Sequence, residues 1–394
     1  MAEPSPSPEK LAFDSIGRRR TYVMKASTRL RNASMILGSL ALSAAGPAFS
    51  SDGPVADASH EAARPTFAAD GTVHVPAFDL PPSSLSSKEA RENLKYAAQL
   101  KQAGSPPKDI SQARQGLDEL MEPMVHMMTQ EYPVNMNEAV IGGVPTRIFT
   151  PADKPVRQDR VLINVHGGAF SVCWDSCSKL ESIPIAAVGG YKVVSVNYRM
   201  APEHKHPAGL EDLVAVYREL LKSYDPRKIG IYGCSAGGSL TAQAASWLGQ
   251  NNLPEPAAIG IFGAGGVPFR TGDSAYISAY VDGNFAAPKP NAEGDISDLT
   301  FGYFDGANMT STVLAAAMYP DVLAKFPPAL IITGSRAMDM SPAIYTNSML
   351  LKAGRPSTLL VGEALGHCFI YSATLPEARD AFNIISRFFD DNMK

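Results

Sequence analysis

The chain has 394 residues, of which 45% are hydrophobic and 19% are charged, proportions typical of a water-soluble globular protein with an ample core. Its net charge of -4 gives no electrostatic reason to expect nucleic acid or an anionic membrane as a partner. Four cysteines in a chain of this length do not make a disulfide scaffold.

The N-terminal part has the features of a secretory signal peptide. Basic side chains follow Met24, an apolar run occupies residues 33–45, and small residues lead up to Ser50. We expect residues 1–50 to be a signal peptide cleaved after Ser50, with Met24 as the natural start and a periplasmic or secreted mature protein. The apolar run is too short to span a membrane, so no stable membrane anchor is expected. A twin-arginine signal at Arg19-Arg20 is a weaker alternative, because further charges separate this pair from the apolar run.

Residues 51–87 are rich in alanine, proline, serine and aspartate and show no hydrophobic period, which predicts a linker or a loosely ordered arm. From residue 88 onward, apolar residues recur at helical spacing. The pattern predicts two helices divided by Gly104-Ser105-Pro106-Pro107.

The remainder of the chain alternates predicted strands with predicted helices. This alternation predicts an α/β fold with a mostly parallel central sheet and helices on both faces. The segment between Phe269 and Pro328 is too long for a simple connection and is expected to help form the wall of a binding site. The predicted strands are Val144–Phe149, Arg160–Val165, Val193–Val196, a short one from Ile229, Ala258–Phe262, Ala329–Thr333 and Thr358–Val361. Helices are predicted near Lys179–Val188, over Glu211–Leu221, after Gly238 and near Glu377–Phe389.

The pentapeptide Gly233-Cys234-Ser235-Ala236-Gly237 fits the pattern Gly-x-Ser-x-Gly and stands between a predicted strand and a predicted helix. This is the setting of a nucleophile elbow, a turn so sharp that the positions around the serine must be nearly free of side chains. Strain in such a turn lifts the hydroxyl above the strand ends and directs the following backbone N–H groups toward one point. A glycine-rich turn without chemistry is the alternative, which the pentapeptide alone does not exclude.

A serine hydroxyl needs a base that takes its proton and an acid that orients the base. In this architecture the acid and the histidine follow the serine in chain order, each after a later strand. His367 is the only histidine beyond Ser235, and Asp339 lies in the loop after the preceding predicted strand. We therefore predict Ser235, Asp339 and His367 as the catalytic residues. Glu363 and Asp321 are competing acids, although Glu363 shares a loop with His367 and has less freedom to reach the far ring nitrogen.

The oxyanion of a tetrahedral intermediate also needs donors. His166-Gly167-Gly168-Ala169-Phe170 follows a predicted strand, and its two glycines let backbone N–H groups approach a ligand. A motif of this kind pairs with the residue after an elbow serine to form an oxyanion hole. We predict Gly167, Gly168 and Ala236 as the oxyanion donors and His166 as a brace for the loop. A plain glycine turn is the alternative.

From about Ile141 to its end, the chain resembles the bacterial hormone-sensitive-lipase-like (family IV) esterases, a branch of the α/β-hydrolase superfamily. The resemblance implies the α/β-hydrolase fold, with an N-terminal helical cap over residues 88–135 and a catalytic domain over residues 136–394. It implies the same nucleophile, base and acid as the motifs do. The stretches that carry it are His166–Phe170, Asn197–Asp212 and Gly233–Gly238.

Three positions depart from the family pattern. The family usually has glycine where Ala169 stands and aspartate where Cys234 stands. Its acid is commonly followed by Pro-Leu, whereas Asp339 is followed by two other residues before Pro342. The last departure bears most directly on the assignment of the acid.

The expected function is that of a serine carboxylesterase for short-chain acyl esters, with a small-molecule ester as substrate and no metal or organic cofactor. Deacetylation of a sugar polymer, opening of a lactone, or hydrolysis at a lipid surface would use the same residues. A non-catalytic ligand-binding protein of this fold is a rival from another class, but such proteins typically lose the histidine that is present here as His367. Glu203, His204 and His206 lack a further nearby ligand and are expected to be structural rather than a metal site. The sequence does not decide whether the chain forms a homodimer.

The four cysteines lie beside the predicted motifs, two after the oxyanion motif and two next to predicted catalytic residues. Cys173 and Cys177 lie just past the oxyanion motif, and they can form a disulfide if a turn brings their Cα atoms within about 7 Å. Cys234 and Cys368 each adjoin a predicted catalytic residue, and we expect both to be buried, small apolar side chains.

Overall fold

The computed structural model describes residues 64–100, 109–283, 285–288 and 299–394. The chain divides after Pro76 into two compact units. In the described part of the first unit, the short strands β1 (Thr66–Phe67) and β2 (Val73–His74) pair as an exposed antiparallel hairpin. The predicted signal peptide and the predicted break between the two N-terminal helices lie outside the described residues.

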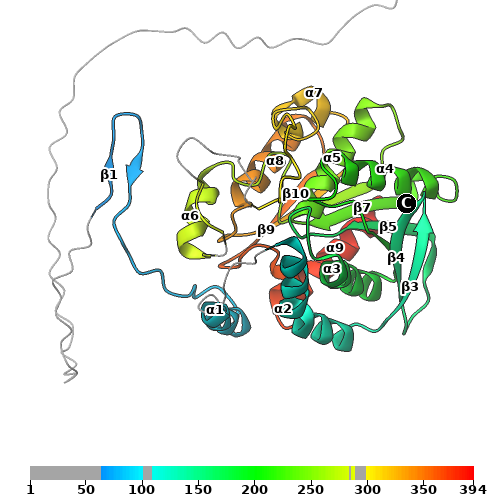
Figure 1. Ribbon diagram of the computed structural model, residues 1–394, viewed down its shortest axis with the longest axis horizontal. Coiled ribbons are helices and arrows are strands. Elements are labelled where there is room, and N and C mark those ends of the chain that lie inside the picture. The colour runs from blue at the N-terminus through cyan, green and yellow to red at the C-terminus, as the bar shows by residue number, and fades with distance from the viewer. Residues whose placement is uncertain (1–63, 101–108, 284, 289–298) are drawn as a thin grey trace, which may run out of the picture. The chain divides into compact units, whose positions relative to one another are not determined.

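The second unit is built on an eight-stranded sheet, which crosses the centre of Figure 1. The strands are β3 (Val134–Ile141), β4 (Val144–Pro151), β5 (Arg157–Val165), β6 (Tyr191–Val196), β7 (Ile229–Cys234), β8 (Ala258–Phe262), β9 (Ala329–Gly334) and β10 (Ser357–Gly362). Their order across the sheet is β10-β9-β8-β7-β5-β6-β4-β3. Neighbours from β10 to β6 run parallel, whereas β4 and β3 add antiparallel strands at one edge. The predicted mostly parallel sheet is confirmed.

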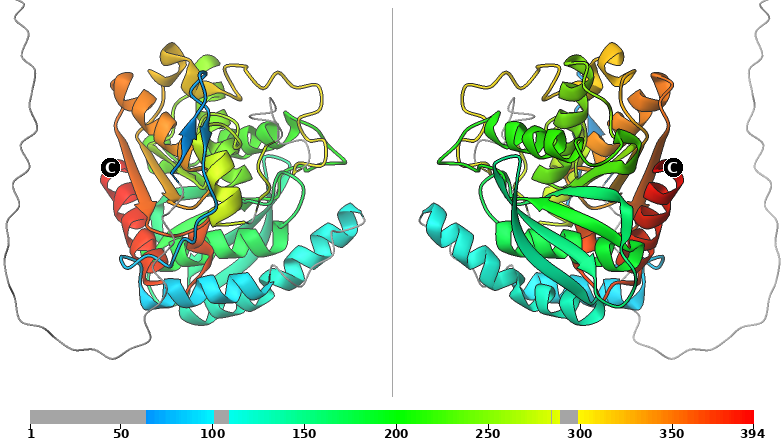
Figure 2. Two further views of the ribbon diagram at one scale, coloured as in Figure 1. Left: turned by 90° about the vertical axis from the view of Figure 1, so that its left-hand side faces the viewer. Right: turned by 90° about the vertical axis from the view of Figure 1, so that its right-hand side faces the viewer.

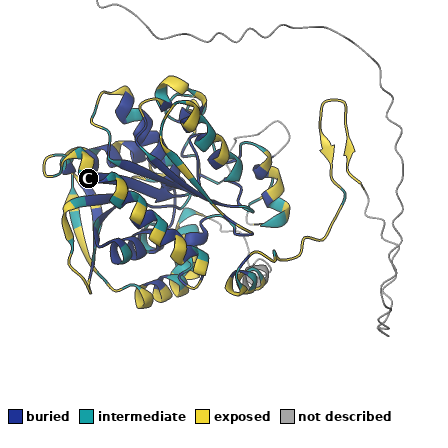
Figure 3. Ribbon diagram, turned by 180° about the vertical axis from the view of Figure 1, so that it is seen from behind, coloured by how far each residue is buried: buried dark blue, intermediate teal, exposed yellow. Residues whose placement is uncertain are grey.

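Helices cover both faces of this sheet. Along β5, Val161, Ile163 and Val165 pack into a core with α4 and α5, whereas Leu162 packs on the opposite face with α3 and α9. Burial on both faces explains why the parallel strands are almost uniformly apolar, and Figure 3 shows these strands as buried. The helices that cover the sheet are α3 (Trp174–Gly189), α4 (Ala208–Leu220), α5 (Ala236–Gln250), α8 (Met340–Lys352) and α9 (Pro376–Asn392). Shorter elements are η1 (Pro226–Lys228), α6 (Asp273–Val281), η2 (Ala316–Met318), α7 (Pro320–Leu323) and η3 (Phe369–Tyr371).

Two helices, α1 (Lys88–Leu100) and α2 (Ile110–Glu131), precede the sheet, as the helical spacing predicts. Asp109 caps α2 by accepting a hydrogen bond from the Gln112 N–H at 2.9 Å. Helix α2 then runs alongside α3, as both views of Figure 2 show. Among the described residues, no helix combines the length and the apolar character that crossing a membrane requires.

Strand β3 was not predicted from the sequence. It begins at Val134, before the predicted start of the catalytic domain at residue 136. Most of its residues are exposed or only partly buried because it lies at the sheet edge, so it lacks the apolar pattern that marks the inner strands. In the parallel part of the sheet, the carboxyl ends of the strands share one edge, and the turns after β5, β7, β9 and β10 therefore meet there.

Candidate active site

The turn after β7 holds Ser235 in a conformation that few residues adopt. Its φ of 59° and ψ of -121° lie outside the regions that L-amino acids favour. A Cβ at Gly233 or Gly237 would lie 2.1 or 1.7 Å from the carbonyl oxygen of Val165, so glycine is required at both positions. The Ser235 N–H donates to the Phe262 carbonyl at 2.8 Å and fixes the turn against β8. The sharp strand-to-helix turn predicted from the pentapeptide is thus present, and its serine is only partly buried.

Three predicted side chains form one hydrogen-bonded chain. Ser235 Oγ lies 2.8 Å from His367 Nε2, and His367 Nδ1 lies 2.6 Å from Asp339 Oδ1. Asp339 is fully buried, and the Thr333 hydroxyl donates to its Oδ2 at 2.5 Å. Thr333 was missed in the sequence because a threonine near a strand end carries no motif. This arrangement is able to move the serine proton onto the imidazole and to stabilise the imidazolium that results.

The two competing acids lie elsewhere. Glu363 and Asp321 are both exposed to solvent. Asp339 occupies the N-cap position of α8 but makes no capping hydrogen bond with its side chain. Both of its carboxylate oxygens are therefore directed to Thr333 and His367 rather than to the helix.

Two phenylalanine rings stand beside the imidazole. The ring of Phe285 meets His367 edge-on, with centroids 5.5 Å apart, and Phe269 meets it at 6.3 Å. Both come from the long segment that follows β8. They place apolar surface next to the imidazole.

The turn after β5 brings three successive residues into left-handed backbone conformations. The φ angles of Gly168, Ala169 and Phe170 are 105°, 51° and 63°. Glycine adopts such angles freely, whereas alanine there costs roughly 1 kcal/mol, which gives a physical reason for the family's glycine at position 169. The Phe170 ring stacks on Tyr303 at 4.8 Å and anchors the end of the turn.

Glu181 of α3 is a buried carboxylate that the sequence analysis did not single out. Its Oε1 accepts hydrogen bonds from the Gly167 N–H at 2.8 Å and the Tyr371 hydroxyl at 2.6 Å. Its Oε2 accepts from Asn164 Nδ2 at 2.9 Å and from the Cys234 N–H at 3.0 Å. The carboxylate therefore connects the turn after β5, strand β7 and η3. No local motif signals this role, because the partners are scattered along the chain.

The contact with Glu181 corrects the prediction for Gly167. Its N–H is already bonded and so is not available to an oxyanion. A Cβ at Gly167 would lie 2.6 Å from the Tyr371 hydroxyl, so close packing explains the glycine. In the described part of the chain, the N–H groups of Gly168, Ala169 and Ala236 have no acceptor.

His166 is fully buried behind the same turn and is held neutral. Burial lowers its pKa to about 4. Its ring stacks on Tyr198 at 4.3 Å, and its Nδ1 donates to the Gly167 carbonyl at 2.6 Å. These contacts support the predicted role as a brace.

Glu181 and His166 give the stability of the fold opposing pH dependences. Burial raises the pKa of Glu181 from 4.5 to about 7, so the folded state holds a proton there that the unfolded state has lost. Burial lowers the pKa of His166 from 6.5 to about 4, so the folded state lacks a proton that the unfolded state binds. As pH rises, Glu181 therefore lowers the free energy of unfolding between pH 4.5 and 7. His166 raises it between pH 4 and 6.5, each slope being at most about 1.4 kcal/mol per pH unit.

In Glu181→Gln, only the His166 contribution of this pair remains. We expect the variant to lose stability toward acid more steeply than the wild type, by about 3 kcal/mol between pH 7 and 4.5. Urea unfolding at a series of pH values measures this difference. Glu363→Gln, at an exposed glutamate, should keep the wild-type profile. Parallel profiles for Glu181→Gln and the wild type would contradict the assignment.

All four cysteines are joined in disulfides. Cys173 and Cys177 have their Cα atoms 5.2 Å apart, so the condition for the predicted disulfide is met at the start of α3. Cys234 and Cys368 are both buried, as predicted, but they are not separate side chains, because a disulfide joins them. They lie 134 residues apart in the sequence, and the turn after β10 brings them together over the end of β7.

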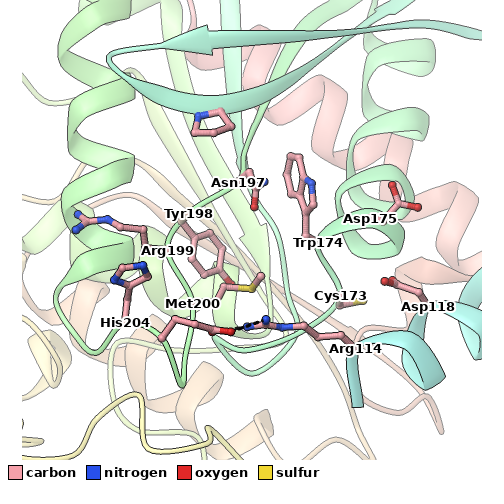
Figure 4. A pocket seen from close by; sticks show the side chains of 12 residues that line it. Arg114, Asp118, Cys173, Trp174, Asp175, Asn197, Tyr198, Arg199, Met200 and His204 are labelled. Atoms are coloured by element: carbon pink, nitrogen blue, oxygen red, sulfur yellow. Dashed lines mark hydrogen bonds and ion pairs between the residues drawn. The ribbon is translucent and has the colours of Figure 1, made fainter. Parts of the chain in front are cut away.

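A pocket of about 530 Å³ is lined in part by Cys173 and Trp174, which follow the turn after β5, and Figure 4 shows its lining. Arg114 of α2 lines this pocket, donates to the carbonyls of Ser171 and Ala201, and pairs with Glu203 at 2.7 Å. Helix α2 thereby anchors the turn. The lining residues are Arg114, Asp118, Pro145, Cys173, Trp174, Asp175, Asn197, Tyr198, Arg199, Met200, Glu203 and His204.

Glu203 and His206, two of the three residues expected to be structural, contact other side chains. Glu203 pairs with Arg114, and the His206 ring lies 5.7 Å from that of Phe304. Within the described ranges, no group of three or more histidine, cysteine, aspartate or glutamate side chains is arranged to hold a metal ion.

Comparison with known proteins shows which family the chain belongs to. A family model described as the alpha/beta hydrolase fold matches residues 162–371, more than half of the chain. The chain belongs to the α/β-hydrolase family. This hydrolase is 28% identical over 243 residues to an acetyl-hydrolase of Streptomyces hygroscopicus, an alignment that covers 60% of the chain and 77% of that protein.

Comparison with solved structures shows that the fold is similar to that of esterases. This hydrolase matches the structure of esterase E25 with a TM-score of 0.70 and 27% identity, covering 82% of the chain and 99% of that structure. It matches an esterase of the bacterial hormone-sensitive lipase family with a TM-score of 0.69 and 26% identity, covering 79% of the chain and all of that one. The resemblance to hormone-sensitive-lipase-like esterases predicted from the motifs is confirmed.

Proposed function

We propose that this carboxylic ester hydrolase is a serine esterase that cleaves short-chain acyl esters through an acyl-enzyme on Ser235. The observation that carries the proposal is the hydrogen-bonded chain from Ser235 through His367 to Asp339. His367 takes the Ser235 proton as the hydroxyl attacks the ester carbonyl, and Asp339 stabilises the imidazolium. His367 then protonates the leaving alcohol and activates the water molecule that releases the acid.

Three backbone N–H groups serve as oxyanion donors in this mechanism. Gly168 and Ala169 offer two from the turn after β5, and Ala236 offers the third from the first position of α5. The N-terminus of that helix adds a favourable partial positive charge. The proposal is supported by the absence of any acceptor for these groups in the described part of the chain. Glu181 acts indirectly by fixing the turn through Gly167.

A short acyl chain is supported by two observations. The rings of Phe285 and Phe269 stand close beside His367 and limit the space there. One relative is named an acetyl-hydrolase. That name also favours a second candidate, a deacetylase for larger acetylated substrates that uses the same residues.

A series of p-nitrophenyl esters from acetyl to dodecanoyl tests the proposal. We expect kcat/KM to be highest for the acetyl to butanoyl esters and to fall steadily for longer chains. A rate that increases with chain length, or that rises sharply above the solubility limit of the ester, would instead indicate a lipase. Labelling with a fluorophosphonate separates the enzyme from a non-catalytic binding protein, because only an activated Ser235 forms the adduct.

We also propose that the protein is exported to the periplasm or secreted. The segment over residues 1–50 and the two disulfides support this, because disulfides persist in oxidising compartments. Fractionation of cells that produce the full chain tests the proposal. Recovery of uncleaved protein from the cytoplasm alone would contradict it.

A further inference from the structure

The Cys234–Cys368 disulfide joins the residue before Ser235 to the residue after His367. The nucleophile turn and the histidine turn are therefore linked covalently at the positions next to the two side chains that share a hydrogen bond. Strands β8 and β9 separate β7 from β10 in the sheet, so no strand pairing links these two turns directly. The disulfide supplies that link.

One sulfur atom of the disulfide lies close to the imidazole itself. Cys368 Sγ is 3.7 Å from His367 Nε2, the nitrogen that faces Ser235. A Cβ at Gly263 would lie 2.9 Å from Cys368 Sγ, 3.1 Å from Cys234 Sγ and 3.2 Å from His367 Cε1. The disulfide and the ring thus pack on the same short stretch of backbone.

The hydrogen bonds that hold the histidine turn lie on either side of it. Before His367, the Ala364 N–H donates to the Ser335 hydroxyl at 2.7 Å and the Arg336 N–H donates to the Leu365 carbonyl at 3.0 Å. After it, the Tyr371 hydroxyl donates to Glu181 at 2.6 Å. Between these anchors, the disulfide fixes the turn against β7.

We propose that the Cys234–Cys368 disulfide is a redox-sensitive tether that positions His367 against Ser235, so that opening it with a dithiol lowers turnover. The inference rests on the proposed esterase function. The two cysteines act through His367 and are positioning residues. Misplacement of a catalytic group by about 1 Å costs on the order of 10²-fold in rate, which sets the expected size of the effect.

The chemistry is a two-electron thiol–disulfide exchange. One thiolate of the dithiol attacks Cys368 Sγ, since Cys368 is 9% exposed and Cys234 is fully buried. The S–S bond breaks, Cys234 leaves as a thiolate and takes up a proton, and a mixed disulfide forms. The second thiol of the reductant then displaces Cys368, so the dithiol becomes a cyclic disulfide and the protein holds two thiols.

Steady-state kinetics on the whole protein with p-nitrophenyl acetate, before and after dithiothreitol, test the proposal. We expect kcat to fall about 10²-fold with little change in KM, an unchanged circular dichroism spectrum, and recovery on reoxidation with oxidised glutathione. Thiol alkylation followed by mass spectrometry reports which disulfide has opened. Unchanged kcat in protein whose Cys234 and Cys368 are alkylatable would overturn the proposal.

Matched variants separate this disulfide from the other one. Cys173→Ala/Cys177→Ala should respond to dithiothreitol by the same factor as the wild type. Cys234→Ala/Cys368→Ala should show the low kcat without reductant and no further response, and wild-type kcat in this folded double variant would overturn the proposal. The dithiol experiment decides the matter where that variant does not fold. Oxidised wild-type protein that cleaves no ester contradicts the proposed function instead, so the two failures are distinguishable.

Discussion

Replacing Ser235 by alanine is expected to lower kcat for p-nitrophenyl acetate by about 10⁶-fold. The alanine lacks the oxygen that attacks the carbonyl, and His367 then has no hydroxyl to deprotonate. Some rate above that in water should persist, because the proposed oxyanion donors and the binding site remain. KM should change little. Steady-state assays on highly purified variant measure the residual rate. The preparation must be free of wild-type enzyme, because even traces of it would mask this rate.

Ser239→Ala is the matched control for this variant. Ser239 lies one turn further along α5, and its N–H donates to the Ser235 carbonyl at 3.0 Å, but its hydroxyl does not belong to the hydrogen-bonded chain of Ser235, His367 and Asp339. It should retain most of the wild-type activity. If Ser235→Ala and the wild type hydrolyse the ester at equal rates, another residue is the nucleophile.

Replacing Asp339 by asparagine is expected to lower kcat by about 10⁴-fold. The amide removes the charge that stabilises the imidazolium, and its NH₂ group does not accept the hydrogen bond that fixes the His367 tautomer. The side chain is fully buried and makes no capping bond to α8, so the loss should appear in catalysis more than in folding. Thermal unfolding measured beside the kinetics separates the two effects.

The competing acids provide the controls. Glu363→Gln and Asp321→Asn change carboxylates that are exposed and make no contact with His367 among the described interactions. Both variants should keep near wild-type kcat. A loss in Glu363→Gln comparable with that in Asp339→Asn would show that the acid comes from the histidine's own loop.

Features with local signals could be predicted from the sequence. Ser235 stands in a pattern that only a sharp strand-to-helix turn needs, and His367 is the only histidine beyond it. The inner strands were found because burial on both faces makes them uniformly apolar. The acid followed from chain order alone, and the buried contact of Asp339 with His367 now supports that choice.

Features that depend on long-range contacts could not be predicted in the same way. Glu181 sits in a largely buried helix, and its partners Gly167, Asn164, Cys234 and Tyr371 are 14, 17, 53 and 190 residues away. Nothing local marks such a carboxylate, and without it Gly167 looks like a free donor. Edge strand β3 was not predicted for a different reason: its residues are exposed or only partly buried and follow no apolar pattern.

The covalent loop closed by Cys234 and Cys368 also changes the unfolded chain. Its ends lie 134 residues apart in the sequence, so it removes far more loop-closure entropy from the denatured ensemble than the loop of Cys173 and Cys177, whose ends lie four residues apart. In the chain-entropy picture these restrictions correspond to about 5 and about 2 kcal/mol of stabilisation. The same loop contains β8, β9, β10 and the long segment after β8, so a single proteolytic cut anywhere within it leaves the two fragments attached.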